Sequence, residues 1–296
     1  MKISVSSIAF KNLEELLNFF DSHRKMYLEL GVNLSKRDIS KIREKDIKIS
    51  SLHVPSPKEP LLPNFASFDS AALEKSLTIL MKSVEVANEL DVDTLVIHPG
   101  YALDGLLPTD SKERDALLAE WAEKEKDFII HESFSVTEAS YVKSDVYRKY
   151  LENLAFNLSK LRIFLEKHLA LENLNPRLFY IPQTPEDVVY LVEKTDFDIC
   201  LDTGHLWISS QVNDFDFYEG LESILRTHKV RVVHLNNNSS NSSKGQFKDD
   251  HDHLLSGEID MHKVLRILDG YDIEVLTVEV KRDPTEDVTF LLNHFS

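Results

Sequence analysis

Eight short runs of apolar and β-branched residues recur along the chain, and helical patterns separate them. This alternation constrains the fold more than any other feature of the sequence. The predicted strands are Lys2–Ile8, Met26–Val32, Ile47–His53, Asp93–His98, Ala170–Asn173, Asp198–Asp202, Val230–Leu235 and Glu274–Val280. Strands that alternate with helices indicate βα units and a parallel sheet. Eight such units in 296 residues predict an α/β fold, a single-domain (β/α)8 TIM barrel over residues 1–296.

Apolar residues at helical spacing predict the intervening helices. Three stripes stand out: Leu13, Leu16, Leu17 and Phe20; Leu73, Leu77, Leu80, Val84 and Ala87; and Leu151, Leu154, Leu158, Leu161 and Leu165. A further helix is expected to start at Pro185, because proline followed by acidic residues favours a first helical turn. Residues 103–144, between the fourth and fifth strands, are predicted to be an insertion on the loop face, a lid or a substrate wall. The polar stretch Asn236–Ser243 is predicted to be a flexible loop.

Charge and cysteine content narrow the classes of function. The chain has 34 Lys and Arg against 50 Asp and Glu, a formal net charge of −16. Such a surface repels nucleic acid and anionic membranes at long range, so DNA is disfavoured as a partner. The one cysteine, Cys200, cannot form an intrachain disulfide, which fits a reducing, cytoplasmic setting. No apolar run approaches the ~18 residues of a membrane span.

Histidine and carboxylate side chains gather where the predicted strands end. The strand-end residues are His53, His98, Glu172, Asp202, His234 and Glu279, and His205, Asp249 and His251 follow in two loops. Carboxyl ends of barrel strands meet at one face and carry the catalytic groups of such folds. Histidine nitrogen and carboxylate oxygen are the usual ligands of zinc and manganese. Nine such groups exceed the needs of one ion and predict two or three.

A lone histidine is more often a packing or surface residue than a ligand, so the joint pattern carries the prediction. The remaining histidines, His23, His131, His168, His228, His262 and His294, are interpreted as surface or packing residues. His253 is an alternative to His251 as the candidate ligand in the loop after the seventh strand. Buried carboxylates such as Glu172 and Glu279 are a stronger signal, because burial without a partner costs several kcal/mol.

These residues resemble the motifs of the xylose isomerase-like superfamily of TIM barrels, and within it the endonuclease IV type of apurinic/apyrimidinic endonuclease. The matching runs are Leu52-His53-Val54-Pro55, Val96-Ile97-His98-Pro99-Gly100, Leu171-Glu172-Asn173, Cys200-Leu201-Asp202-Thr203-Gly204-His205, Val233-His234-Leu235-Asn236, Asp249-Asp250-His251, Gly257-Glu258-Ile259 and Val278-Glu279. They extend from the third strand to the eighth. The sequence departs from the family pattern at Asn236-Asn237-Asn238 and at Leu255.

The resemblance implies a site for three zinc ions and hydrolysis of a phosphodiester. It implies that Glu172 bridges two ions and that His53 and His98 complete one of them. It further implies that Asp202, His234 and Glu279 hold the second ion, and His205, Asp249 and His251 the third. Zinc ions in such a site would activate a water molecule and neutralise phosphoryl oxygens.

Two other functions remain open at this stage. Sugar (phosphate) isomerases and epimerases of the same superfamily use one divalent ion, often Mn2+ or Mg2+, held by the equivalents of Glu172, Asp202, His234 and Glu279. In that reaction, Glu172 and Glu279 would also move a proton beside a carbonyl group. A small sugar suits an acidic protein with a lid-like insertion. The last alternative is a barrel that binds metal or ligand without catalysis.

Overall fold

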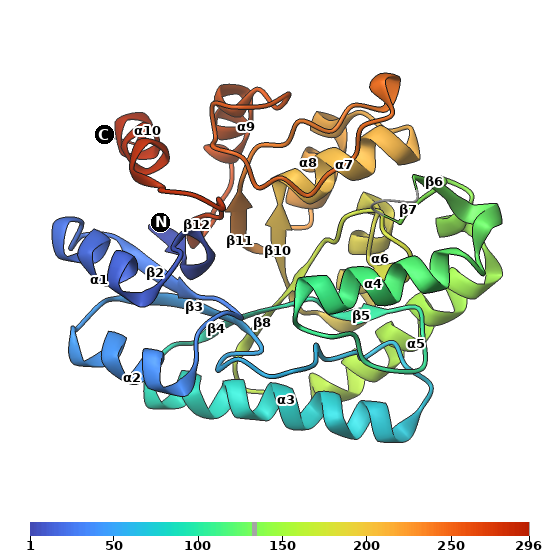
Figure 1. Ribbon diagram of the computed structural model, residues 1–296, viewed down its shortest axis with the longest axis horizontal. Helices are drawn as coiled ribbons and strands as arrows, with labels where there is room; N and C mark the ends of the chain where they lie inside the picture. The colour runs from blue at the N-terminus through green and yellow to red at the C-terminus, as the bar shows by residue number, and fades with distance from the viewer. Residues whose placement is uncertain (132–134, 296) are drawn as a thin grey trace.

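The computed structural model describes residues 1–131 and 135–295 and contains a closed barrel of eight parallel strands (Figure 1). The strands are β1 (Lys2–Ser6), β2 (Tyr27–Leu30), β3 (Ile49–Val54), β4 (Thr94–Ile97), β8 (His168–Glu172), β10 (Asp198–Asp202), β11 (Val230–Leu235) and β12 (Val275–Val278). Their order around the barrel is β1-β12-β11-β10-β8-β4-β3-β2. The predicted TIM barrel and all eight predicted strands are thus confirmed.

Pairing of the first strand with the last closes the ring. Lys2 pairs with Val275 and Val5 with Val278, so β1 lies parallel to β12, while its other edge pairs with β2. Closure leaves the eight-stranded barrel itself without an open strand edge that could pair with another chain. In Figure 1 the blue first elements accordingly lie beside the red last ones.

Helices surround the barrel. They are α1 (Leu13–Ser22), α2 (Lys36–Glu44), α3 (Ser70–Glu89), α4 (Ser111–Ala122), α5 (Asp145–Leu161), α6 (Pro185–Thr195), α7 (Thr203–Asn213), α8 (Phe217–Leu225), α9 (Met261–Leu268) and α10 (Thr285–His294). The predicted apolar stripes lie on α1, α3 and α5, except for Leu165, which lies beyond the C-terminal end of α5. Helix α6 begins at Pro185 as predicted, and Thr184 and Asp187 form a capping box there. No helix of the described residues is long and apolar enough to span a membrane.

The interior of the barrel is apolar in the middle and polar near its carboxyl end. Val96, Ala170, Cys200, Val232 and Val275 form a buried cluster inside the ring. Side chains two positions apart on a strand point to the same face. The residues two positions after the first four of these are His98, Glu172, Asp202 and His234, so the strand period places those side chains in the layer above the apolar cluster.

The segment between β4 and β8 forms structure of its own. Besides α4, it contains the short antiparallel strands β6 (Ile129–His131) and β7 (Val136–Thr137), and the adjoining β5 (Gly100–Tyr101) pairs with β9 (Tyr180–Ile181). Helix α4 occupies most of the stretch Ser111–Lys126. Residues 132–134 of the predicted insertion 103–144 lie outside the described residues.

The prediction of a flexible loop at Asn236–Ser243 is wrong for its first half. Asn236, Asn237, Asn238 and Ser240 are buried. Asn237 donates hydrogen bonds to the carbonyl oxygens of Leu254 and Ile259 at 2.7 and 3.0 Å. Asparagine is a hydrophilic residue, so a run of asparagines suggests an exposed loop. Its side-chain amide can nevertheless form hydrogen bonds with backbone groups inside a folded loop. Amino-acid composition alone does not reveal such bonds.

Candidate metal centre

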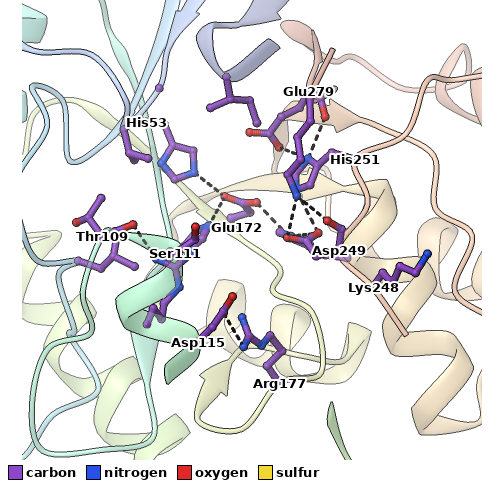
Figure 2. A pocket seen from close by; sticks show the side chains of 18 of the residues that line it. His53, Thr109, Ser111, Asp115, Glu172, Arg177, Lys248, Asp249, His251 and Glu279 are labelled. Atoms are coloured by element: carbon purple, nitrogen blue, oxygen red, sulfur yellow. Dashed lines mark hydrogen bonds and ion pairs between the residues drawn. The ribbon is translucent and has the colours of Figure 1, made fainter. Parts of the chain in front are cut away.

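All nine residues predicted to bind metal lie together at the carboxyl end of the barrel, in three groups. Figure 2 labels five of them: His53, Glu172, Asp249, His251 and Glu279. The groups are His53, His98 and Glu172; His205, Asp249 and His251; and Glu172, Asp202, His234 and Glu279. Within each group the candidate ligand atoms lie within 4.8 Å of one another. Glu172 belongs to two groups, which is the arrangement that a bridging carboxylate requires.

The first group is built on β3 and β4. His53 Nε2 lies 2.9 Å from Glu172 Oε2, and His98 Nε2 lies 3.3 Å from the same oxygen. The other ring nitrogens face fixed partners: His53 Nδ1 lies 3.2 Å from the carbonyl oxygen of Val54, and His98 Nδ1 lies 3.2 Å from the Tyr101 hydroxyl. Both imidazoles therefore present Nε2 to Glu172.

The second group joins the start of α7 to the loop after β11. His251 Nε2 and His205 Nε2 lie 3.1 and 3.5 Å from Asp249 Oδ1. His205 Nδ1 donates to the carbonyl oxygen of Asn173 at 3.0 Å, and His251 Nδ1 donates to that of Glu279 at 2.9 Å. When these imidazoles are neutral, the two hydrogen bonds set the tautomer that leaves Nε2 with a free lone pair, as in metal-bound histidines.

The third group is the most deeply buried. His234 Nδ1 lies 3.0 Å from Glu279 Oε2, 3.7 Å from Glu172 Oε1 and 3.9 Å from Asp202 Oδ2. This nitrogen is buried and has no hydrogen-bond partner among the described residues. A buried nitrogen aimed at three carboxylates fits a divalent cation, and the donor set of nitrogen and oxygen without thiolate fits zinc or manganese.

The electrostatics of the groups depend on the histidines. Burial alone would raise the pKa of Glu172, but the charge of His98 and the close approach of His205, His234 and His53 hold it well below its usual range. Burial raises the pKa of Asp202 to about 6, against the opposing charge of His205. Divalent cations would replace the histidine protons as the countercharge of these carboxylates.

Backbone geometry explains the run Asp202-Thr203-Gly204-His205. Asp202 accepts from the backbone N–H of His205 at 2.7 Å and thereby caps α7. Its other oxygen accepts from Asn236 Nδ2 at 2.9 Å. A Cβ atom on residue 204 would clash with the Asn236 side chain. Glycine is therefore required where the helix start approaches the loop that orients Asp202.

The alternative candidate His253 is not supported as a ligand. His253 Nδ1 lies 2.7 Å from Asp287 Oδ2, outside the three groups. His23 stacks on Phe19 with ring centres 4.2 Å apart, and His168 pairs with Asp198 at the opposite end of the barrel. Those two histidines have the packing and surface roles that were predicted.

Sequence reasoning missed one carboxylate beside the site, Glu29 on β2. Its side chain is fully buried, and Oε1 lies 3.0 Å from His234 Nε2. Glu29 Oε2 also accepts from Ser51 Oγ at 2.7 Å. Glu29 thus contacts the ring nitrogen opposite to the one that faces Glu279. The signal was present in the sequence, because an acidic residue in a short apolar strand is the same feature that marked Glu172 and Glu279.

A cavity of about 530 Å³ lies above the three groups. Helix α4 supplies part of its wall through Ser111, Arg114 and Asp115, and Arg177 comes from the loop after β8 (Figure 2). Phe247, Lys248 and Lys281 line it from other loops. This volume lies within the range of small-molecule sites.

Comparison with known proteins places the chain in a family. The model of the family described as xylose isomerase-like TIM barrel matches residues 15–292. The chain belongs to this family. Solved structures that resemble this xylose isomerase-like barrel include a sugar epimerase and endonuclease IV. No curated protein sequence matches it.

Solved structures resemble this xylose isomerase-like barrel over nearly its whole length. A D-tagatose 3-epimerase-like protein is 22% identical with a TM-score of 0.68, covering 100% of this chain and 97% of the other. Endonuclease IV from Thermus thermophilus is 19% identical with a TM-score of 0.57, covering 99% and 97%. A further Thermus thermophilus protein, soaked with ZnCl2, is 18% identical with a TM-score of 0.59, again covering 99% and 97%. Likeness at these identities shows the shared fold.

Proposed function

We propose that the protein is a divalent-metal-dependent phosphoesterase that hydrolyses a small phosphodiester with two or three bound ions, zinc being the first candidate. The observation that carries this proposal is that the site contains more candidate metal ligands than one ion needs. Glu172, Asp202, His234 and Glu279 already suffice for one ion. His53, His98, His205, Asp249 and His251 would then have no metal to bind, although all of them lie around the same cavity or its floor.

The residues of the chain have distinct parts in the proposed reaction. Bound divalent cations lower the pKa of an attacking water and neutralise the phosphoryl oxygens. Glu172 holds the groups together as the shared carboxylate. Asp249, with its side chain 27% exposed, reaches the cavity beside Lys281 and marks the side of the site open to substrate. Water adds to phosphorus, one P–O ester bond breaks, and the leaving oxygen takes the proton to give an alcohol and a phosphomonoester.

The cavity favours a small substrate over a DNA duplex. Helix α4 forms part of the cavity wall, and the net charge of −16 opposes a polyanion. We also propose that residues 103–144 form an insertion on the loop face whose α4 makes the substrate wall. The single cysteine, Cys200, is buried, which supports a reducing compartment such as the cytoplasm.

The first test is metal content of the purified, unchelated protein by mass spectrometry, together with hydrolysis of bis(4-nitrophenyl) phosphate. Two to three zinc ions per chain and metal-dependent release of nitrophenol are the expected results. About one manganese or magnesium ion per chain, without hydrolysis of any phosphodiester, would contradict the proposal.

A sugar epimerase or isomerase is the second candidate, because the group Glu172, Asp202, His234 and Glu279 is complete by itself. The small cavity above it suits a sugar equally well. Glu172 and Glu279 would then move the proton beside the carbonyl group. Exchange of a ketose C–H proton in heavy water, followed by NMR, identifies this activity.

A further inference from the structure

Positive charge gathers on the wall of the cavity that faces the metal groups. Apart from the candidate ligands, the charged residues that line the cavity within the described chain are Arg114, Arg177, Lys248, Lys281 and Asp115. Four cations therefore stand against one carboxylate. The whole chain has the opposite balance, 34 cationic against 50 acidic residues. With the candidate ligands Glu172, Asp249 and Glu279 included, the lining has four cations and four carboxylates, so the cavity is richer in cations than the chain as a whole.

Arg177 is the best-fixed cation of this wall. Its side chain is only 6% exposed, and Nη2 lies 2.9 Å from Asp115 Oδ1. The guanidinium group also lies over the Tyr180 ring, 5.6 Å from its centre. Gln183 Nε2 donates to the carbonyl oxygen of Arg177 at 2.8 Å and holds the loop behind it. A buried, pre-oriented guanidinium group is the side chain best suited to bind an oxyanion in two-point contact.

The partner of Arg177 can be replaced. Asp115 lies on α4, and its side chain is 57% exposed. Figure 2 shows this carboxylate beside Arg177 on the side of the cavity away from His53 and Glu279. An exposed carboxylate gives up a contact at low cost, because water solvates it readily, whereas the buried guanidinium needs a countercharge. A ligand oxyanion can therefore take the place of Asp115.

Neighbouring groups complete the wall. Arg114 Nη1 donates to the carbonyl oxygens of Pro108 and Thr109, both at 2.9 Å, which fixes this second guanidinium group. Lys281 lines the cavity, and its Nζ lies 3.9 Å from Oδ2 of Asp249 in the second ligand group. Lys248 lines the cavity from the loop after β11.

We propose that this wall is a second anion-binding subsite and that the substrate carries an anionic group besides the ester that is cleaved. The ligand chemistry is a terminal oxyanion, a phosphate or a carboxylate, on a body small enough for the cavity. Arg177 binds it in place of Asp115. This inference rests on the proposed phosphoesterase function for the reaction, but not for the binding of the anion.

The kinetic test uses three 4-nitrophenyl phosphodiesters whose second ester arm ends in a phosphate, a carboxylate or a hydroxyl group. The kcat/KM of the preferred anionic arm should exceed that of the hydroxyl arm about tenfold or more, as expected for a charge-assisted contact. Arg177→Met should reduce this ratio about tenfold, Arg177→Lys should reduce it less, and Asp115→Asn should increase it. The matched control is Lys41→Met on the outside of α2, which removes the same charge and should leave the ratio unchanged.

Equal kcat/KM values for all three arms, or equal losses on all arms in Arg177→Met with unaltered thermal unfolding, would overturn the subsite. The phosphate and carboxylate arms together identify which oxyanion it takes.

A binding test keeps this inference separate from the proposed function. Inorganic phosphate is titrated into the metal-free full-length chain, after removal of the chelator, by calorimetry. Weaker phosphate binding in Arg177→Met and tighter binding in Asp115→Asn support the subsite even if no phosphodiester is hydrolysed. The same phosphate affinity in wild type and in both variants would overturn it even if hydrolysis is observed.

Discussion

The two ends of the barrel both carry charged side chains, but they balance the charges differently. At the amino end, Glu274 lies 2.9 Å from Lys2 Nζ, and Asp198 lies 2.8 Å from Arg231 Nε. Arg231 also contacts Glu274. Each of these carboxylates faces a cation that keeps its charge at every physiological pH.

At the carboxyl end, the two buried carboxylates Glu172 and Asp202 face histidines instead. Glu172 and Asp202 are almost fully buried, and the ion pairs that the structure records for them involve histidines, with no Lys or Arg among the described residues. A histidine can lose its proton and offer a lone pair, which arginine cannot. At the amino end, lysine and arginine side chains of the protein therefore neutralise the carboxylates. At the carboxyl end, the arrangement is suited to neutralising them with bound metal ions. The following predictions test this difference.

The largest effect is expected from Glu172→Gln, because this carboxylate is shared by two ligand groups. Metal content should fall, and turnover should drop by more than about 100-fold. This loss exceeds the one usually caused by removing a residue that only hydrogen-bonds to a metal ligand. Mass spectrometry and steady-state kinetics measure the two effects. Glu274→Gln is the matched control at the amino end and should leave both within about twofold of wild type. Full activity in Glu172→Gln would contradict a metal-dependent reaction at this site.

His98→Ala separates a multi-ion centre from a single-ion one. His98 belongs to the first ligand group and is not one of the four residues that suffice for a single ion. In a centre of two or three ions its loss should lower metal content by about one ion and turnover by about 100-fold. In a single-ion epimerase the same change should reduce turnover only slightly. His262→Ala, which removes a ring packed against Phe290, is the control.

Glu29→Leu should weaken metal binding by about 10- to 100-fold, the usual cost of losing the carboxylate behind a metal-bound histidine. Glu29 orients His234 through a contact of 3.0 Å at Nε2. Glu29→Gln, which keeps an acceptor oxygen, should lose less. Competition with a chromophoric chelator measures the affinity, and Asp198→Asn at the amino end is the control. Unchanged affinity in Glu29→Leu would show that Glu29 has no part in holding the metal.

The metal-free protein should lose stability as pH rises from about 6.5 to 9. Burial would lower the pKa of His251, but Asp249 raises it to about 9, above the value of about 6.5 expected in the unfolded chain. Protonated His251 therefore stabilises the fold fully below about pH 6.5, and this stabilisation disappears as pH rises to 9. Calorimetry of the chelated protein measures it. Asp249→Asn should flatten the dependence; a metal-free unfolding temperature that increases over this range would refute the assignment.

The smallest effect is expected from Arg231→Met at the amino end. Its ion pairs with Asp198 and Glu274 are partly exposed, and such pairs contribute about 1 kcal/mol or less. Chemical denaturation should show that small loss, with metal content and turnover unaltered. A large loss of metal in this variant would mean that the two ends of the barrel are coupled, contrary to the comparison above.

Much of this arrangement could be predicted from the sequence because it depends on local periodicity. Each of the eight strands was visible as a short apolar run, and His98, Glu172, Asp202 and His234 stood at or next to the ends of four of these runs. The position of these residues at strand ends then predicted that they would meet. His251 rather than His253 joins the second group, which required the fold of the loop after β11 to decide.

Contacts between distant segments were beyond such reasoning. Glu29 meets His234 across 205 residues, and their contact depends on how the strands are staggered around the closed ring. Arg177 meets Asp115 only because α4 folds over the cavity. The order of Asn236–Asn238 likewise comes from partners on another part of the chain, such as Leu254 and Ile259.

The sequence by itself determined the barrel and its set of nine candidate ligands, because strand period and chain order dictate which side chains reach the carboxyl end. The family resemblance implied how those ligands divide into three groups, and the structure brings them together in those groups. The tertiary structure alone decided which further carboxylate contacts His234 and which side chains form the wall that faces the ligands. These features depend on distances between strands and loops far apart in the chain, which only the closed and packed barrel sets.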